Sequence, residues 1–155
     1  MNLKSVSFGG TAALTANMAL ITGLQAAMAS KTSVIVSLLI TAIADNLTDS
    51  LSVHIYQESE GLEPKAAFAT TVSNFFTRLS VSLSFIFIVY LIPPPLAVAT
   101  CISWGLLLLC SFTFLLARQR QVSVLSEMTK HVLGAITVIF LSKWMGHWIL
   151  VTLNP

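Results

Sequence analysis

The chain has 155 residues, of which 55% are hydrophobic and only 9% charged, and its formal net charge is +2. Its mean hydropathy is +0.86. Soluble domains usually carry about 25% charged residues, so this composition excludes an ordinary soluble domain, and the small net charge gives no reason to expect a nucleic-acid partner. A helix of about 20 apolar residues spans the hydrocarbon core of a bilayer, which leaves room for five spans and little else. We therefore expect an all-α, multi-pass integral membrane protein with one domain over residues 1–155.

The first expected span, residues 8–28, is rich in glycine and alanine at helical spacing. Small residues let helix backbones approach closely in a membrane, so this span is our candidate for a helix buried against other helices or against the second subunit of a homodimer. The alternative is that these residues are simply common in membrane helices. Lys4, the apolar run and Ala27 to Ala29 also imitate a secretory signal with its cleavage site, an alternative that Asn17 in the middle of the run opposes.

The second expected span, residues 32–58, begins as an apolar run and turns polar at Asp45 without a glycine or proline break. We therefore expect one continuous helix. At about 100° per residue, its polar side chains fall on two neighbouring stripes. One stripe holds Asp45, Thr48, Asp49, Ser52 and Tyr56, and the other holds Asn46, Ser50, His54 and Gln57. Ionisable residues inside a membrane are costly there and mark functional sites by default.

Three further spans are expected at residues 66–91, 96–117 and 131–153, with a polar linker at residues 118–130 before the last one. Lysine and arginine gather in the loops that share a side with the N-terminus, and only Lys31 lies on the other side. This bias predicts a cytoplasmic N-terminus and a C-terminus on the opposite side. The membrane is a bacterial inner membrane or an organellar one.

The third span places Asn74 and Arg78 on one helix face. Counting ~1.5 Å per residue from the cytoplasmic side, Arg78 lies level with Asp45 near the middle of the bilayer. A charged side chain at that depth costs on the order of 2.5–3.5 kcal/mol, so the carboxylates and the guanidinium should meet. We expect an ion pathway that consists of Asp45, Asn46, Asp49, Asn74, Arg78 and Asn17.

One arginine against two aspartates leaves one negative charge that a cation or a proton could neutralise. We expect Arg78 to pair mainly with Asp45, which leaves Asp49 free to exchange a metal for protons. The alternative is a buried Asp–Arg pair that only locks two helices together. Carboxylate and imidazole suit Fe²⁺ and Mn²⁺, so Asp45, Asp49, His54 and Glu58 are the candidate metal ligands.

No nucleotide-binding loop, nucleophile elbow or HExxH pair is visible in the sequence. We therefore expect no enzyme, no catalytic residue and no permanently bound cofactor, with Fe²⁺ or Mn²⁺ entering only as a substrate. Two alternatives stay open. One is a membrane scaffold or accessory subunit that transports nothing, and the other is a transporter of a non-metal substrate that Arg78 binds directly.

Several short motifs, taken in order, resemble the vacuolar iron transporter family. The stretch from Pro64 to Thr70, followed by Ser73, resembles the start of that family's third helix. Gln57 with the acidic residues after it resembles the end of the second helix, and the pair Ser142-Lys143 with Gly146 resembles a motif of the fifth. The glycine late in the family's first helix is matched by Gly23.

The chain also departs from that family's pattern. Residues 9–13 carry no acid where the family has an aspartate, and only residues 58–65 stand where the best-known members carry a glutamate-rich metal-binding insertion. In the second helix, Asp45, Asn46 and Asp49 occupy the neighbourhood of the family's methionine and glutamate. The resemblance implies a homodimeric, five-helix transporter that moves divalent iron or manganese out of the cytosol in exchange for protons.

Overall fold

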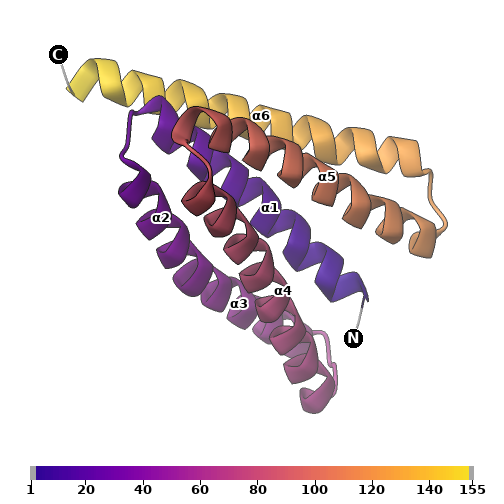
Figure 1. Ribbon diagram of the computed structural model, residues 1–155. Helices are drawn as coiled ribbons and strands as arrows, with labels where there is room; N and C mark the ends of the chain where they lie inside the picture. The colour runs from indigo at the N-terminus through magenta and orange to yellow at the C-terminus, as the bar shows by residue number, and fades with distance from the viewer. Residues whose placement is uncertain (1–2, 154–155) are drawn as a thin grey trace.

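The computed structural model describes residues 3–153, and every regular element in that range is a helix (Figure 1), which confirms the all-α class. The elements are α1 (Leu3–Ala26), α2 (Lys31–Ile40), the π-helical segment η1 (Thr41–Asp45), α3 (Asn46–Ser59), α4 (Pro64–Leu91), α5 (Pro94–Arg120) and α6 (Val124–Leu153). Because α2, η1 and α3 follow one another without a break, the described chain forms five helical rods.

Four of these rods, within residues 3–153, are long and apolar enough to cross a membrane. They are Lys31–Ser59, Pro64–Leu91, Pro94–Gln119 and Val124–Leu153. This finding supports an integral membrane protein with several spans. The expected fifth span, α1, does not reach the same apolarity, because Asn17, Gln25 and several threonines and glycines interrupt its apolar residues.

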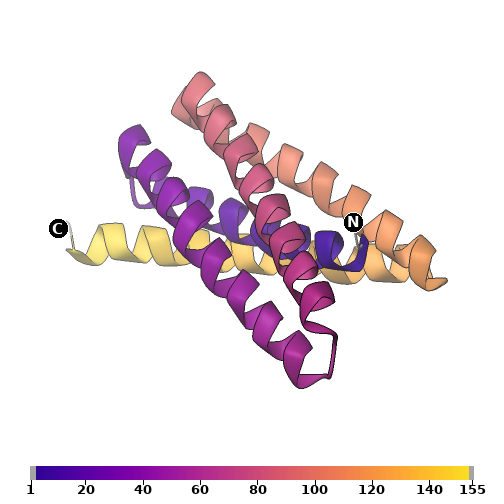
Figure 2. The same ribbon diagram turned by 90° about the horizontal axis from the view of Figure 1, so that it is seen from below.

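The central position of α1 explains why it needs less apolar surface than the others. It packs against α4, α5 and α6 and also touches α2, whereas α2, η1, α3 and α4 form a layer that crosses over it (Figure 2). Leu14 and Met18 are fully buried at its middle. A helix surrounded by other helices meets protein rather than lipid, so small and polar side chains can replace large apolar ones.

Glycines set the closest helix contacts of the bundle. A Cβ atom on Gly146 of α6 would overlap the carbonyl oxygen of Gly23 in α1. A Cβ atom on Gly105 of α5 would overlap the sulfur of Met18. At Gly146 the backbones of α6 and α1 therefore meet directly, whereas at Gly105 the missing side chain of α5 makes room for Met18 of α1.

Helix boundaries follow local signals. Pro64 and Pro94 are the first residues of α4 and α5, and Ser30 caps α2 by accepting from the amide of Ser33. The expected polar linker at residues 118–130 is wrong, because α5 continues to Arg120 and α6 already begins at Val124. Gln121, in the left-handed conformation (φ 54°), ends α5. Residues 118–130 contain no proline or glycine, so helix can form on both sides of this short turn.

Candidate functional site

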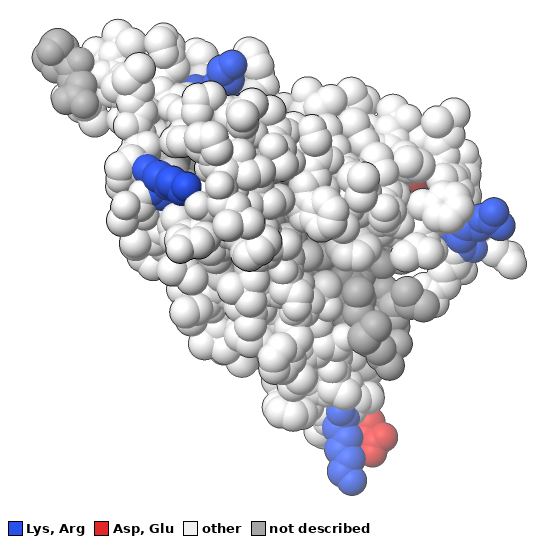
Figure 3. All heavy atoms as spheres, viewed as in Figure 1, with Lys and Arg blue, Asp and Glu red and all other residues white. Residues whose placement is uncertain are grey.

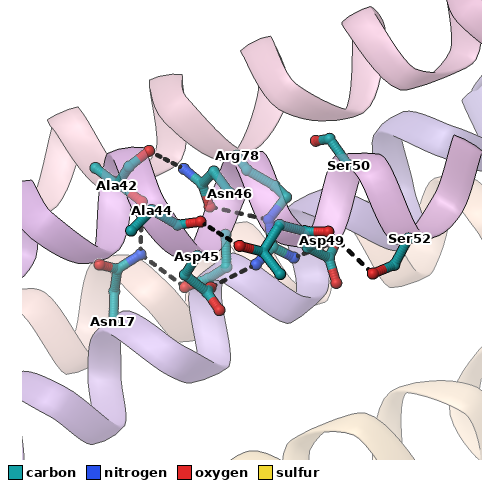
Figure 4. A network of polar contacts seen from close by, with 12 residues as sticks. Asn17, Ala42, Ala44, Asp45, Asn46, Asp49, Ser50, Ser52 and Arg78 are labelled. Atoms are coloured by element: carbon teal, nitrogen blue, oxygen red, sulfur yellow. Dashed lines mark hydrogen bonds and ion pairs between the residues drawn. The ribbon is translucent and has the colours of Figure 1, made fainter.

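Arg78 of α4 is the centre of a polar cluster between α3 and α4. Its side chain is only 3% exposed. Nη2 donates to Oδ2 of Asp45 at 2.8 Å, and Nε donates to Oδ1 of Asn46 at 2.9 Å. Nη1 forms an ion pair with Oδ2 of Asp49 at 3.0 Å. The structure thus brings together the carboxylates and the guanidinium that the sequence places at one depth (Figure 4).

The two carboxylates differ in exposure and in partners. The side chain of Asp45 is 52% exposed and that of Asp49 is 33% exposed. Asp49 also accepts a hydrogen bond from Asn74 at 3.4 Å. The expectation that Arg78 pairs mainly with Asp45 and leaves Asp49 free is therefore wrong, because the guanidinium is wide enough to contact both acids. Asp45 is the more accessible carboxylate.

Uncharged side chains hold the cluster in place. Asn46 donates to the carbonyl of Ala42 at 2.7 Å, which leaves its own Oδ1 directed at Arg78. Asn74 donates to the hydroxyl of Ser50 at 3.2 Å as well as to Asp49. Asn46, Ser50 and Asn74 are buried, so the first two polar residues of the stripe that runs from Asn46 to Gln57 bind α4.

Asn17 of α1 belongs to a separate polar contact. It donates to the carbonyl of Ala13 at 2.7 Å and to the hydroxyl of Ser82 at 3.0 Å. Ser82 lies one helical turn beyond Arg78 on α4, so this contact continues the polar face of that helix. Sequence reasoning missed Ser82, although its spacing of four residues from Arg78 is a signal.

The π-helical segment η1 ends at Asp45, and the cluster begins there. A π-helical turn holds an extra residue and shifts the angular register between the helices before and after it. Asp45 from η1 and Asn46 from α3 both reach Arg78 across this junction. Such turns occur frequently at functional sites. No glycine or proline marks η1, so this π-helical turn could not be predicted from local residue types.

An open groove of about 540 Å³ lies beside Asp45. Thr41 and Asp45 contribute to it from η1, and the remaining wall comes from α1 and α6. The α1 side runs from Ala16 to Ala27 and consists of small and aliphatic residues, while Ser142 and Gly146 contribute from α6. The groove thus extends from Asp45, in the middle of the candidate span Lys31–Ser59, to Ala27, just after the C-terminal end of α1.

The polar stripe that holds Asp45, Thr48, Ser52 and Tyr56 is not covered by any other part of residues 3–153. Thr48, Ser52 and Tyr56 are exposed, as is Asp45, and their neighbours Leu47 and Leu51 are exposed as well. The hydroxyls of Thr48 and Ser52 bond to carbonyls of their own helix. In a bilayer, the carboxylate on this stripe requires a cover other than lipid.

The four predicted metal ligands lie in two separate pairs. Asp45 and Asp49 meet at Arg78, while Nε2 of His54 contacts Oε1 of Glu58 at 3.4 Å further along α3. Across the part of the chain that the structure describes, no three histidine, cysteine, aspartate or glutamate side chains come together. A complete ligand set would therefore need water, a substrate or a second copy of the chain.

Gly9 of α1 is a contact that sequence reasoning did not assign to the site. A Cβ atom there would overlap Oδ1 of Asn74 and would lie 3.2 Å from Cγ of Arg78. The side chain of Asn74 thus occupies the space that any residue other than glycine would need. The signal in the sequence was the pair Gly9-Gly10 near the start of the first expected span.

We expect Gly9→Ala to destabilise the protein by about 1–3 kcal/mol, because overpacking at this contact displaces Asn74 and disturbs Arg78. The matched control is Gly134→Ala in α6, where nothing lies within 4 Å of the added Cβ and the alanine should favour the helix. Melting temperatures in detergent compare the two variants. Equal melting temperatures for Gly9→Ala and the wild type would contradict the close contact.

Comparison of the chain with protein families, with curated proteins and with solved structures finds no match.

Proposed function

We propose that the protein is a secondary transporter that moves a divalent metal cation, Fe²⁺ or Mn²⁺, out of the cytosol in exchange for protons. The observation that carries this proposal is the half-exposed carboxylate of Asp45, which stands on an open groove in the middle of a candidate membrane span. Ionisable groups at such positions are characteristic of ion pathways and proton relays.

The charge balance of the cluster supports a cation as the substrate. Asp45 and Asp49 bring two negative charges, and Arg78 supplies one positive charge. The remaining negative charge can be neutralised either by part of a metal ion's charge or by a proton. Exchange of one for the other is the chemistry that a metal–proton antiporter needs.

The burial of Arg78 argues against transport of an anionic substrate. Its Nε and Nη2 donate to Asn46 and Asp45, and its Nη1 pairs with Asp49. An anion would have to displace these partners in a space where only 3% of the side chain is exposed. Between the two transport hypotheses, this geometry favours a metal.

The uncovered polar stripe supports a homodimer. The carboxylate of Asp45 needs a protein surface opposite it, and the adjoining wall of α1 includes Ala16, Ala19 and Gly23, small residues that allow close helix contact. In our proposal a second copy covers this face, α1 is the fifth span, and the N-terminus lies in the cytoplasm. An exclusively monomeric protein after crosslinking in membranes would contradict the dimer.

A scaffold without transport activity is the second candidate, and the way in which Arg78 ties two helices together favours it. All three of its contacts join α3 or η1 to α4, which is what a purely structural ion pair would do. The scaffold does not explain why the more exposed carboxylate stands on an open groove rather than inside the contact between the two helices.

Uptake measurements in reconstituted vesicles distinguish the candidates. We expect Fe²⁺ or Mn²⁺ to cross the membrane faster with the protein than without it, and an opposing pH gradient to increase the rate. The control is a vesicle that contains the same amount of Arg78→Met protein, which lacks the central cation of the cluster. Metal flux equal to that of protein-free vesicles, with and without the gradient, would reject transport of these ions.

A further inference from the structure

A second groove lies on α5 and α6, away from the cluster around Arg78. It has a volume of about 380 Å³ and is lined by Cys110, Ser111, Phe114 and Leu115 of α5 and by Met128 of α6. Phe114 and Leu115 are 42% and 50% exposed, so the lining is apolar and accessible. The α5 residues of the groove lie within the candidate span Pro94–Gln119, about one to two and a half turns from its end.

A positive charge stands at the edge of this groove. The guanidinium carbon of Arg118 lies 5.4 Å from the centre of the Phe114 ring, a cation–π contact that places the charge above the apolar lining. Arg118 and Arg120 form the basic last turn of α5 and are exposed. Basic side chains project from this end of the bundle, at the right of Figure 3.

Among the described residues, neither arginine forms an ion pair with an acid, although Arg120 is near enough to Glu127 for a weak electrostatic attraction. The one nearby acid that forms an ion pair, Glu127, contacts Nζ of Lys130 at 2.8 Å. The negative C-terminal end of the α5 dipole attracts both arginines. This attraction does not satisfy the hydrogen-bond donors of their guanidinium groups. An acceptor with a negative charge and several oxygens would satisfy them, and guanidinium binds phosphate in this way.

We propose that this groove binds an anionic glycerophospholipid, with an acyl chain against Phe114 and Leu115 and the phosphate on Arg118 and Arg120. Three observations select this occupant: the lining is apolar, it lies inside a candidate span, and the unpaired charge stands at the end of that span. Basic pockets between spanning helices at the membrane surface bind anionic head groups for the same reasons. The inference is independent of what the protein transports.

The test measures the lipid preference of delipidated, detergent-solubilised protein. We expect phosphatidylglycerol to raise the melting temperature more than phosphatidylcholine with the same acyl chains. Arg118→Gln should lower the relative affinity for phosphatidylglycerol by about fivefold, the effect of removing one basic charge near an anionic head group. The matched control is Lys65→Gln, which removes another exposed charge at the start of α4 and should keep the full preference.

A thiol inside the groove provides a second readout. Cys110 lines it and is partly accessible, whereas Cys101 is buried, so labelling by a maleimide should report on Cys110. We expect phosphatidylglycerol to slow this labelling, and Ser111→Phe, which fills the groove, to remove the preference for that lipid while Arg118 is intact.

Three results would overturn the proposal. The first is equal stabilisation by the two lipids, and the second is a full preference retained in Arg118→Gln. The third is a Cys110 thiol that is protected in native membranes but reacts freely in phosphatidylglycerol vesicles, because that result would assign the groove to a protein partner.

Discussion

Replacing Arg78 with methionine is expected to lower the melting temperature by about 10 °C, which corresponds to about 3–5 kcal/mol for a chain of this size. Methionine retains much of the apolar volume of the side chain but removes the donors to Asp45 and Asn46 and the charge opposite Asp49. Two carboxylates would then stand together in a candidate span without a counter-ion. Removing one partner of such a pair is costly because the remaining charge is uncompensated.

The origin of this loss can be tested by removing the acids as well. The triple variant Arg78→Met, Asp45→Asn, Asp49→Asn carries no charge in the cluster, so we expect it to melt above Arg78→Met alone. Arg78→Lys should fall between the wild type and Arg78→Met, because lysine keeps the charge but cannot contact three side chains with a planar fork. A triple variant that melts as low as the single one would show that packing, rather than charge, is lost.

The all-helical architecture with several candidate membrane spans could be predicted from the sequence, because it follows from the composition and from the spacing of apolar runs. Pro64 and Pro94 begin α4 and α5 within two residues of the expected positions. The single long helix through Asp45 was expected from the absence of a glycine or proline break. The low apolarity of α1 was harder to interpret, because a helix enclosed by other helices and a helix outside the membrane share that pattern.

The contact between Arg78 and the two aspartates could also be predicted, because counting residues along two antiparallel spans puts the three side chains at a similar depth. The individual contacts could not, because they depend on angular register. The π-helical turn at Thr41–Asp45 shifts the register between α2 and α3 without any marking residue, and the cluster begins at its last residue. The contact of Gly9 with Asn74 likewise depends on how α1 crosses α4, which no local pattern encodes.

The exposure of the two carboxylates leads to the last prediction, which assigns the substrate-facing role to Asp45. Asp45 is the more exposed acid and lines the groove between α1 and α6, while Asp49 is also bonded by Asn74. We expect Asp45→Asn to lower metal transport by at least about tenfold, the scale on which even indirect partners of a metal change its affinity. Asp49→Asn should have the smaller effect, because asparagine can still accept from Asn74.

Both variants should remain folded, and this separates a transport defect from a structural one. Arg78 keeps Asp49 in the first variant and keeps Asp45 and Asn46 in the second, so neither leaves the guanidinium without a carboxylate. Transport in vesicles and melting temperature are measured for each, with Thr48→Val as the control for a loss of polarity on the same exposed stripe. Normal transport by Asp45→Asn would mean that the pathway does not follow the groove. Unfolding of both aspartate variants would mean that the acids serve the contact between α3 and α4, because the carboxylate that remains in each would then be insufficient to hold Arg78 in place.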